Sequence, residues 1–161
     1  MDTPPDATSF LKSSPHFAGL QTATMKRIAT RCRLKTRQAG EHLFVEGDPG
    51  RDLYILVSGR VKCLRASPKG REQILKIFER PGDMFCTTSA FNTGTHIVTA
   101  DAINHVSLHV IDVETIKRVA LEEPAVALAL VTTAGDQMRS LVSLADDLSL
   151  KTATARVAKL R

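Results

Sequence analysis

The chain has 161 residues, 43% of them hydrophobic, which is enough for one good core and an accessory element. No apolar stretch approaches the roughly 20 residues that cross a bilayer, and the N-terminus has no secretory pattern. We therefore expect a soluble, cytoplasmic protein without a membrane partner.

The net charge of +5 is divided unevenly along the chain. Residues 1–80 hold 15 Lys and Arg against 8 Asp and Glu, residues 81–148 hold 3 against 9, and residues 149–161 hold 4 against none. Basic ends fit a nucleic-acid partner, because Lys and Arg neutralise phosphates. An ordinary mixed surface explains the same distribution.

The N-terminal segment, residues 1–13, is largely polar and carries two prolines, so we expect it to be disordered or loosely attached. A single helical turn is predicted at 14–17. An amphipathic helix with a basic outer face is predicted over 21–32. Cys32 lies on its apolar stripe and is interpreted as a core residue, because a buried free cysteine behaves as a small hydrophobe.

In the middle of the chain, five glycines recur at regular intervals, and each follows a short apolar-rich run. At intervals of 12, 11, 12 and 12 residues these are Gly47, Gly59, Gly70, Gly82 and Gly94. Tight turns favour glycine, and the apolar runs between them alternate as strands do. Strands are predicted at 43–45, 53–57, 61–64, 74–78 and 106–111. Residues 67–70 fit a type I turn that joins two strands into a hairpin.

Helical spacing returns at Asp112, which is predicted to cap a short helix ending near Pro124. A longer helix follows to about Leu148. It carries a coiled-coil seam with a seven-residue period: Ala127, Val131, Ala134, Met138, Leu141, Ala145 and Leu148. The helix could instead pack on its own β-roll, but a second apolar face can do that at the same time, comprising Leu128, Leu130, Val142 and Leu144. Two apolar faces favour a homodimer.

These elements predict a mainly β fold with flanking helices, an antiparallel β-roll of the jelly-roll kind. The predicted organisation is a loose N-terminus (1–13), a β-roll with N-terminal helices (14–112), a short helix and a long dimerisation helix (113–148), and the beginning of a truncated domain (149–161). The last segment is basic and resumes helical spacing without a stop signal.

Two turn motifs, GE-x-LF-x-EGD-x-G from Gly40 and LY-x-L-x-SG-x-V from Leu53, precede a hairpin and the Gly82-Asp83 corner. In this order, with the seam-bearing helix, they resemble the cyclic-AMP-receptor-protein/FNR family of bacterial transcription regulators. The resemblance covers roughly residues 14–161. It implies that an effector in the roll shifts the long helices of a homodimer and so reorients a C-terminal winged helix-turn-helix on promoter DNA. Here only the beginning of that domain is present.

The resemblance also locates the cassette that holds a cyclic nucleotide in this family. Its Gly-Glu pair falls on Cys86 and Thr87, and its Arg-Ser or Arg-Thr pair falls on His96 and Ile97. The arginine neutralises the cyclic phosphate and the glutamate binds the ribose, so both charges are needed. No Lys or Arg occurs between Arg80 and Lys117, and cAMP is not the expected ligand. Only Arg71, Arg80 or a protonated His96 could replace the missing charge.

The sequence Met84-Phe85-Cys86 resembles the carbon-monoxide-sensing haem members of the family, in which a cysteine at this position ligates iron. Those members have a histidine two residues later, where this chain has Thr88. The resemblance implies haem with Cys86 as an iron ligand, His96 or a partner residue as a substitute second ligand, and nitric oxide or carbon monoxide as the signal. The predicted effector pocket comprises Met84, Phe85, Cys86, Thr87, Thr88, Phe91, His96, Ile97 and Val98.

Other interpretations of the same pocket stay open. It could bind another small organic effector or, as a third choice, a cyclic nucleotide, and Cys86 could be an ordinary buried hydrophobe. Cys63 lies in a predicted strand and is more simply packed than reactive. Three cysteines without CxxC spacing speak against a disulfide framework or a structural zinc site.

No catalytic motif is present, so an enzyme is not expected. The alternative from another class is a cupin-like metalloenzyme, which needs converging histidines. The spacing of His42, His96, His105 and His109 does not provide them. We expect His105 and His109 on the outer face of their strand, with Val106, Leu108 and Val110 pointing inward.

Overall fold

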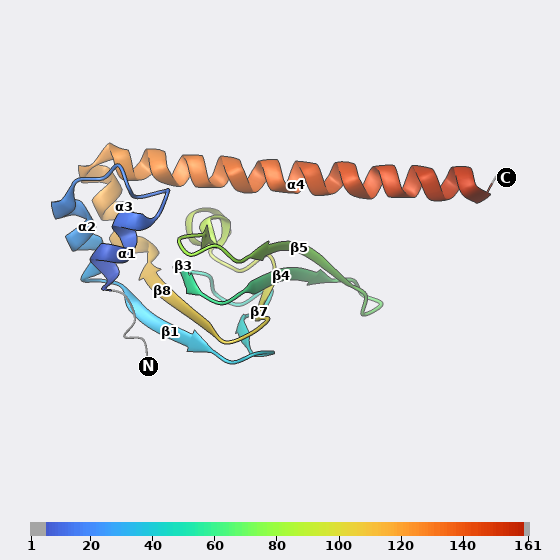
Figure 1. Cartoon of the computed structure of the whole chain (residues 1–161), viewed down its shortest axis with the longest axis horizontal. Coiled ribbons are helices and arrows are strands. Elements are labelled where there is room, and N and C mark those ends of the chain that lie inside the picture. Colours follow the sequence, from blue (N-terminus) through green and yellow to red (C-terminus); the bar gives the residue numbers. More distant parts are fainter. Residues whose placement is uncertain (1–5, 160–161) are drawn as a thin grey trace.

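The computed structural model describes residues 6–159, which form a β-roll with three short helices at one end and one long helix lying across it (Figure 1). The helices are α1 (Ala7–Ser13), α2 (Thr22–Ala29), η1 (a π-helix, Ser89–Thr93), α3 (Val113–Glu122) and α4 (Pro124–Lys159). The strands are β1 (Arg33–Arg37), β2 (His42–Phe44), β3 (Asp52–Ser58), β4 (Val61–Ala66), β5 (Glu72–Phe78), β6 (Met84–Phe85), β7 (Thr99–Ala102) and β8 (Val106–Asp112).

Within the described residues the strands form two four-stranded antiparallel sheets, ordered β1-β8-β3-β6 and β2-β7-β4-β5. One hydrophobic core lies between the two sheets, and a second lies between the first sheet and the helices. Along β3, Leu53 and Ile55 belong to the helical core, and Tyr54 and Leu56 belong to the inter-sheet core. The predicted fold class is thereby confirmed.

The five regularly spaced glycines lie in turns, as predicted. All five of these glycines have positive φ, between 68° and 94°. At Gly59 a close approach adds to this requirement, because a β-carbon there would lie 2.3 Å from the carbonyl oxygen of His105. The predicted hairpin turn also forms, with the amide of Gly70 donating to the carbonyl of Ser67 at 2.9 Å.

The predicted cap of the short helix is confirmed. A carboxylate oxygen of Asp112 accepts from the amide of Thr115 at 2.9 Å, and the apolar stripe of α3 is buried. The cap satisfies an amide that has no partner within the helix. It ends β8 and starts α3 without an intervening loop.

The N-terminus differs from the expectation of a loose segment over 1–13. Residues 7–13 form α1, where Asp6 accepts from the amide of Ser9, and Phe10 and Leu11 are buried in the helical core. These two apolar side chains anchor an otherwise polar segment, which is why composition alone did not indicate a helix. Residues 1–5 lie outside the described residues.

His109 was expected on an outer face, and this is wrong. Val106, Leu108 and Val110 do point into the inter-sheet core, but the opposite face of β8 is covered by helices. The ring of His109 is buried and lies 5.4 Å from that of Phe10 on α1. Both faces of this strand are therefore interior, whereas His105 is exposed.

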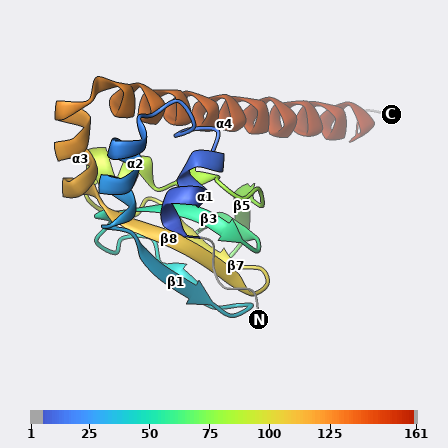
Figure 2. The same cartoon turned by 60° about the vertical axis from the view of Figure 1, so that its left-hand side comes forward.

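Helix α4 is continuous through Lys159, so Leu148 does not mark a break between two helices. Its first part packs on the helical core through Val126 and Leu130, and its later turns run past the roll (Figures 1 and 2). Leu160 of the predicted final stripe lies outside the described residues. No helix within 6–159 combines the length and the apolar character needed to cross a membrane.

The buried imidazole of His109 gives stability a pH dependence. Burial lowers the pKa of His109, and the weaker influence of Asp6 raises it. The unfolded chain therefore binds this proton more readily, so the stability of the fold is greatest above the unfolded pKa of about 6.5 and declines as the pH falls from there through the lower pKa of the folded state.

Neither ring nitrogen of His109 has a hydrogen-bond partner among the described residues. We expect His109→Leu to raise the free energy of unfolding by about 1 kcal/mol near pH 7 and to weaken its decline below pH 6.5, measured by urea unfolding. His105→Leu, at an exposed position, should keep the wild-type pH dependence. An unchanged pH dependence in His109→Leu would contradict this role of the buried ring.

Candidate functional site

A cavity of about 140 Å³ lies where β4, β5 and the segment after β6 meet α4. Its walls are mainly apolar. They are formed by Cys63, Leu75, Lys76, Phe78, Phe85, Cys86, Thr87, Thr88, Ser89, Ile97, Val98, Gln137, Ser140 and Leu141. The cavity is therefore bounded by both sheets and by the long helix.

The chain turns sharply at the inner end of this cavity. The ring of Phe85, the last residue of β6, stacks on Phe78 at 4.8 Å and on Tyr54 at 5.5 Å. The next residue, Cys86, has φ 72° and is the only described non-glycine residue with positive φ. This left-handed turn ends the strand and directs the chain toward η1. It is a strained conformation for any residue with a β-carbon.

Helix α4 is tied to the cavity wall by side-chain hydrogen bonds. The amide nitrogen of Gln137 donates to the carbonyl of Met84 at 2.7 Å, and the hydroxyl of Thr87 donates to the amide oxygen of Gln137 at 3.1 Å. From β5, Nζ of Lys76 donates to the hydroxyl of Ser140 at 3.0 Å. A change in the cavity wall would therefore reach α4 directly.

Sequence reasoning missed Lys76, Gln137 and Ser140. The buried or half-buried face of α4 follows Thr133, Gln137, Ser140 and Leu144, a spacing of four, three and four residues. That spacing is helical, but polar residues interrupt the apolar pattern, so the face was not recognised. Leu128 and Val142, expected to pack on the roll, are exposed instead.

The thiols of the cavity wall are held in their neutral form. Burial raises the pKa of Cys63 to about 12, with a further contribution from Asp101. Burial also raises the pKa of Cys86 well above its usual value, and the Cys63 thiol and Asp52 add to the effect. Among the lining residues, Lys76 alone carries a permanent positive charge.

Six of the nine predicted pocket residues line this cavity: Phe85, Cys86, Thr87, Thr88, Ile97 and Val98. Met84 does not, because successive side chains on a strand point to opposite faces and Met84 lies in the helical core. His96 is buried away from the cavity, stacked on Phe44 at 3.6 Å. The two predicted iron ligands, Cys86 and His96, therefore do not face one cavity.

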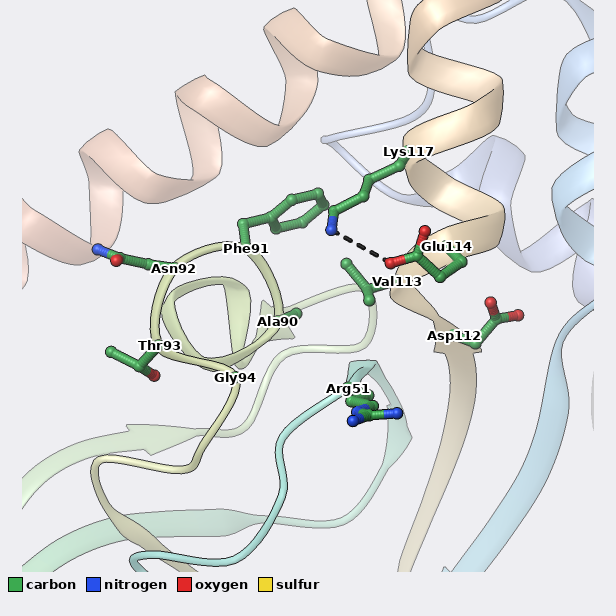
Figure 3. Close-up of a pocket in the computed structure, with 10 residues that line it drawn as sticks. All are labelled: Arg51, Ala90, Phe91, Asn92, Thr93, Gly94, Asp112, Val113, Glu114 and Lys117. Carbon is green, nitrogen blue, oxygen red and sulfur yellow. Dashed lines mark hydrogen bonds and ion pairs between the residues drawn. The ribbon is translucent and has the colours of Figure 1, made fainter.

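Phe91 lies at a different pocket, of about 390 Å³, between η1 and the beginning of α3 (Figure 3). Three of the four charged side chains that the structure describes here have partners within the protein. Lys117 pairs with Glu114 at 3.2 Å, and Asp112 is occupied by the cap of α3. Arg51 enters from the roll below. This pocket is separate from the cavity beneath α4.

The histidines do not converge. His42 pairs with Asp101 at 2.5 Å near the surface, His105 is exposed, and His96 and His109 lie in different cores. Over the described part of the chain, no group of three or more His, Cys, Asp or Glu residues is placed to hold a metal ion. This arrangement does not support the cupin-like alternative.

The predicted seam lies on a largely exposed side of α4. Val131, Met138, Leu141 and Leu148 are exposed large hydrophobic residues, Ala134 and Ala145 are exposed, and Ala127 is half-buried. Val131 and Met138 keep 67% and 68% of their surface accessible. Leu141 also contributes to the cavity wall, so the seam and the cavity share a residue.

The sequence profile of the cyclic nucleotide-binding domain matches residues 34–123, which contain most of the roll and α3. The chain belongs to this family. Within the family, its relatives are regulators of the CRP/FNR type, and the chain corresponds to their sensor region.

One relative of this cyclic nucleotide-binding domain protein is the CRP-like cAMP-activated global transcriptional regulator of Mycobacterium tuberculosis. The two are 29% identical over 143 residues, which cover 89% of this chain and 63% of the relative. The chain thus spans less than two thirds of that protein's length.

Two solved structures are also similar. The N-terminal domain of a transcriptional regulator from Streptomyces coelicolor A3(2) is 31% identical, with a TM-score of 0.65 over 81% of this chain and 92% of that one. The catabolite activator protein of Thermus thermophilus is 28% identical, with a TM-score of 0.74 over 90% of this chain and 68% of that one.

The left-handed turn at Cys86 predicts that a glycine variant at this position is more stable than an alanine variant. We expect Cys86→Gly to have a free energy of unfolding about 1 kcal/mol larger than Cys86→Ala, because only glycine takes this conformation without strain. At Cys63, inside β4, the order should reverse, because glycine weakens a strand. Denaturant unfolding of the four variants measures both differences, and the same order at both positions would contradict the strained turn.

Proposed function

We propose that the chain is the effector-sensing and dimerisation region of a DNA-binding transcription regulator that acts in the cytoplasm. The observation that carries this proposal is the cavity whose fourth wall is α4. An occupant that displaces Gln137 or Ser140 alters the hydrogen bonds between the roll and the helix. It then favours one of two positions of α4, provided that it binds the two states with different affinity.

The partner that covers the seam is proposed to be a second copy of this chain. The exposed apolar residues of α4 follow a seven-residue period, and two such helices bury them by pairing. A contiguous apolar surface of this kind marks an interaction site. Small residues at Ala127, Ala134 and Ala145 let the two helix backbones approach closely.

Promoter DNA is the proposed target of the whole regulator. Support comes from the relatives, which are transcriptional regulators, and from the basic composition of residues 149–161, whose described part, 149–159, belongs to α4. In this proposal, residues 149–161 lead into a winged helix-turn-helix. Rotation of the paired α4 helices then repositions the two DNA-binding domains.

The cavity supports an effector smaller and less anionic than a cyclic nucleotide. Its volume of about 140 Å³ lies below the roughly 300–1,000 Å³ of usual ligand pockets. No arginine is among the described residues that line the cavity, and Arg71 and Arg80 line other pockets. His96, the third candidate for the missing positive charge, is stacked on Phe44 instead. Lys76 is left as the single cation among the described lining residues, and it already binds Ser140.

Haem-borne sensing of nitric oxide or carbon monoxide has weaker support. Cys86 faces the cavity as predicted, but the cavity of about 140 Å³ lies well below the roughly 300–1,000 Å³ of usual ligand pockets and does not enclose a macrocycle. His96 does not line the cavity and cannot act as the second ligand there. The residues present do not fit a haem in this cavity, and a small effector without haem is the better candidate.

The dimer proposal is tested by placing a charge in the seam. Met138→Glu should convert a dimer into a monomer, because the carboxylate would be buried between two apolar helices. Multi-angle light scattering measures the mass. Ser143→Glu adds the same charge at an exposed position outside the seam and should remain dimeric. A Met138→Glu protein with the mass of the wild type would contradict the seam.

A further inference from the structure

Two of the three thiols of this chain line the same cavity. Cys63 comes from β4 in one sheet, and Cys86 follows β6 in the other. Both contribute to the wall of one cavity of about 140 Å³, and the Cys63 thiol is among the groups that raise the pKa of Cys86. Cys32 lies between α2 and β1 and packs against the other core, the helical one, where its thiol donates to the carbonyl of Ile28 at 3.6 Å.

The backbone conformation of Cys86 is a second reason to regard the two thiols of this cavity as a binding site. A glycine would adopt φ 72° without strain, yet a side chain ending in sulfur is present and contributes to the cavity wall. Strained backbone of this kind persists where the surrounding structure imposes it, and it gathers at binding sites. The strained residue, the second thiol and the cavity coincide.

The donor set limits what the pair can bind. Zinc and iron–sulfur sites need about four protein ligands, and the described residues contain no group of three His, Cys, Asp or Glu that could hold a metal. Soft monovalent ions with a filled d shell are stable with two thiolates in a line, and thiolate ligands select Cu(I). The hydroxyl and amide groups that also line the cavity are neutral, and no Asp or Glu is among the described residues that line it, so the carboxylates that hard cations prefer are missing.

We propose that Cys63 and Cys86 form a two-thiolate binding site for one soft monovalent cation of the Cu(I) class. On binding, each thiol loses its proton, two metal–sulfur bonds form, and two protons are released to solvent. No electron is transferred. The resulting complex carries one negative charge.

The negative charge of the metal complex attracts the ammonium of Lys76, which is the single cation among the described lining residues. Lys76 now donates to Ser140 on α4, so a shift of the ammonium toward the complex weakens a bond between the roll and the helix. This consequence rests on the proposed function, in which the cavity controls α4. Binding of the ion by the two thiolates does not depend on the proposed function.

The test is an anaerobic titration of the fully reduced chain with Cu(I), with bicinchoninate as the competing chromophoric ligand. We expect one ion per chain, release of two protons per ion, and an ultraviolet thiolate-to-metal absorption band. Cys63→Ser and Cys86→Gly should each abolish binding. Glycine is the natural replacement at φ 72°, so loss of binding there is not a folding defect, which circular dichroism checks. Cys32→Ser is the matched control and should bind as the wild type does.

Several results would overturn the proposal. These are no binding to the wild type, binding that survives Cys86→Gly, or Zn(II) bound as tightly as Cu(I). The proposal would also be overturned if the oxidant diamide forms a Cys63–Cys86 disulfide in a protein that does not bind Cu(I). A saturable Soret band with haemin that needs Cys86 but not Cys63 would assign Cys86 to haem instead.

A second measurement separates this site from the proposed function. Hydrogen exchange of α4 with and without Cu(I) should differ if the cavity controls the helix. Binding with unchanged exchange supports the metal site and contradicts its role as the effector site. Changed exchange in the wild type that is absent in Cys63→Ser supports both.

Discussion

The central strands β3 and β8 are buried on both faces, and the rest of the structure follows from that constraint. Each strand carries apolar side chains on alternate sides, so one sheet needs a cover above and another below. The second sheet supplies one cover. Helices α1 to α3 and the first turns of α4 supply the other, which is why α1 is ordered and His109 is interior.

The cavity lies at the β6 edge of the first sheet, where the layers that cover its two faces end. β6 is only two residues long, and beyond Phe85 the chain leaves the sheet through the left-handed Cys86. The gap left at that edge is closed by α4, whose side chains there are Gln137, Ser140 and Leu141. A polar contact suits this position, because β6 is an edge strand and Gln137 donates to the buried carbonyl of Met84. The helix that carries the seam is thus also a wall of the cavity.

Local signals in the sequence predicted the roll well. Turn glycines and the Asp112 cap depend on a few neighbouring residues, and all formed as expected. Strands β1, β6 and β7 were harder, because β6 is very short, β1 is mostly charged, and β7 alternates alanine with polar residues. Family resemblance located six of the pocket residues through the Gly82-Asp83 corner.

Long-range packing determined what could not be predicted. Whether His96 and Met84 face the cavity depends on pairing between distant strands and on the stacking of Phe44, which leave no local pattern. The burial of His109 depends on Phe10, 99 positions earlier in the chain. The wall formed by Gln137 and Ser140 depends on how α4 lies across the roll, and a helix pattern alone does not indicate its direction.

Amide hydrogen exchange of the wild type and Gln137→Leu measures directly whether α4 and the β6 edge open and close together. We expect faster exchange in residues 133–144 and in residues 84–88 of the variant, with α1 and α2 unchanged. If residues 133–144 exchange faster while residues 84–88 keep the wild-type rate, the helix and the cavity wall are not coupled, and α4 cannot report what the cavity holds.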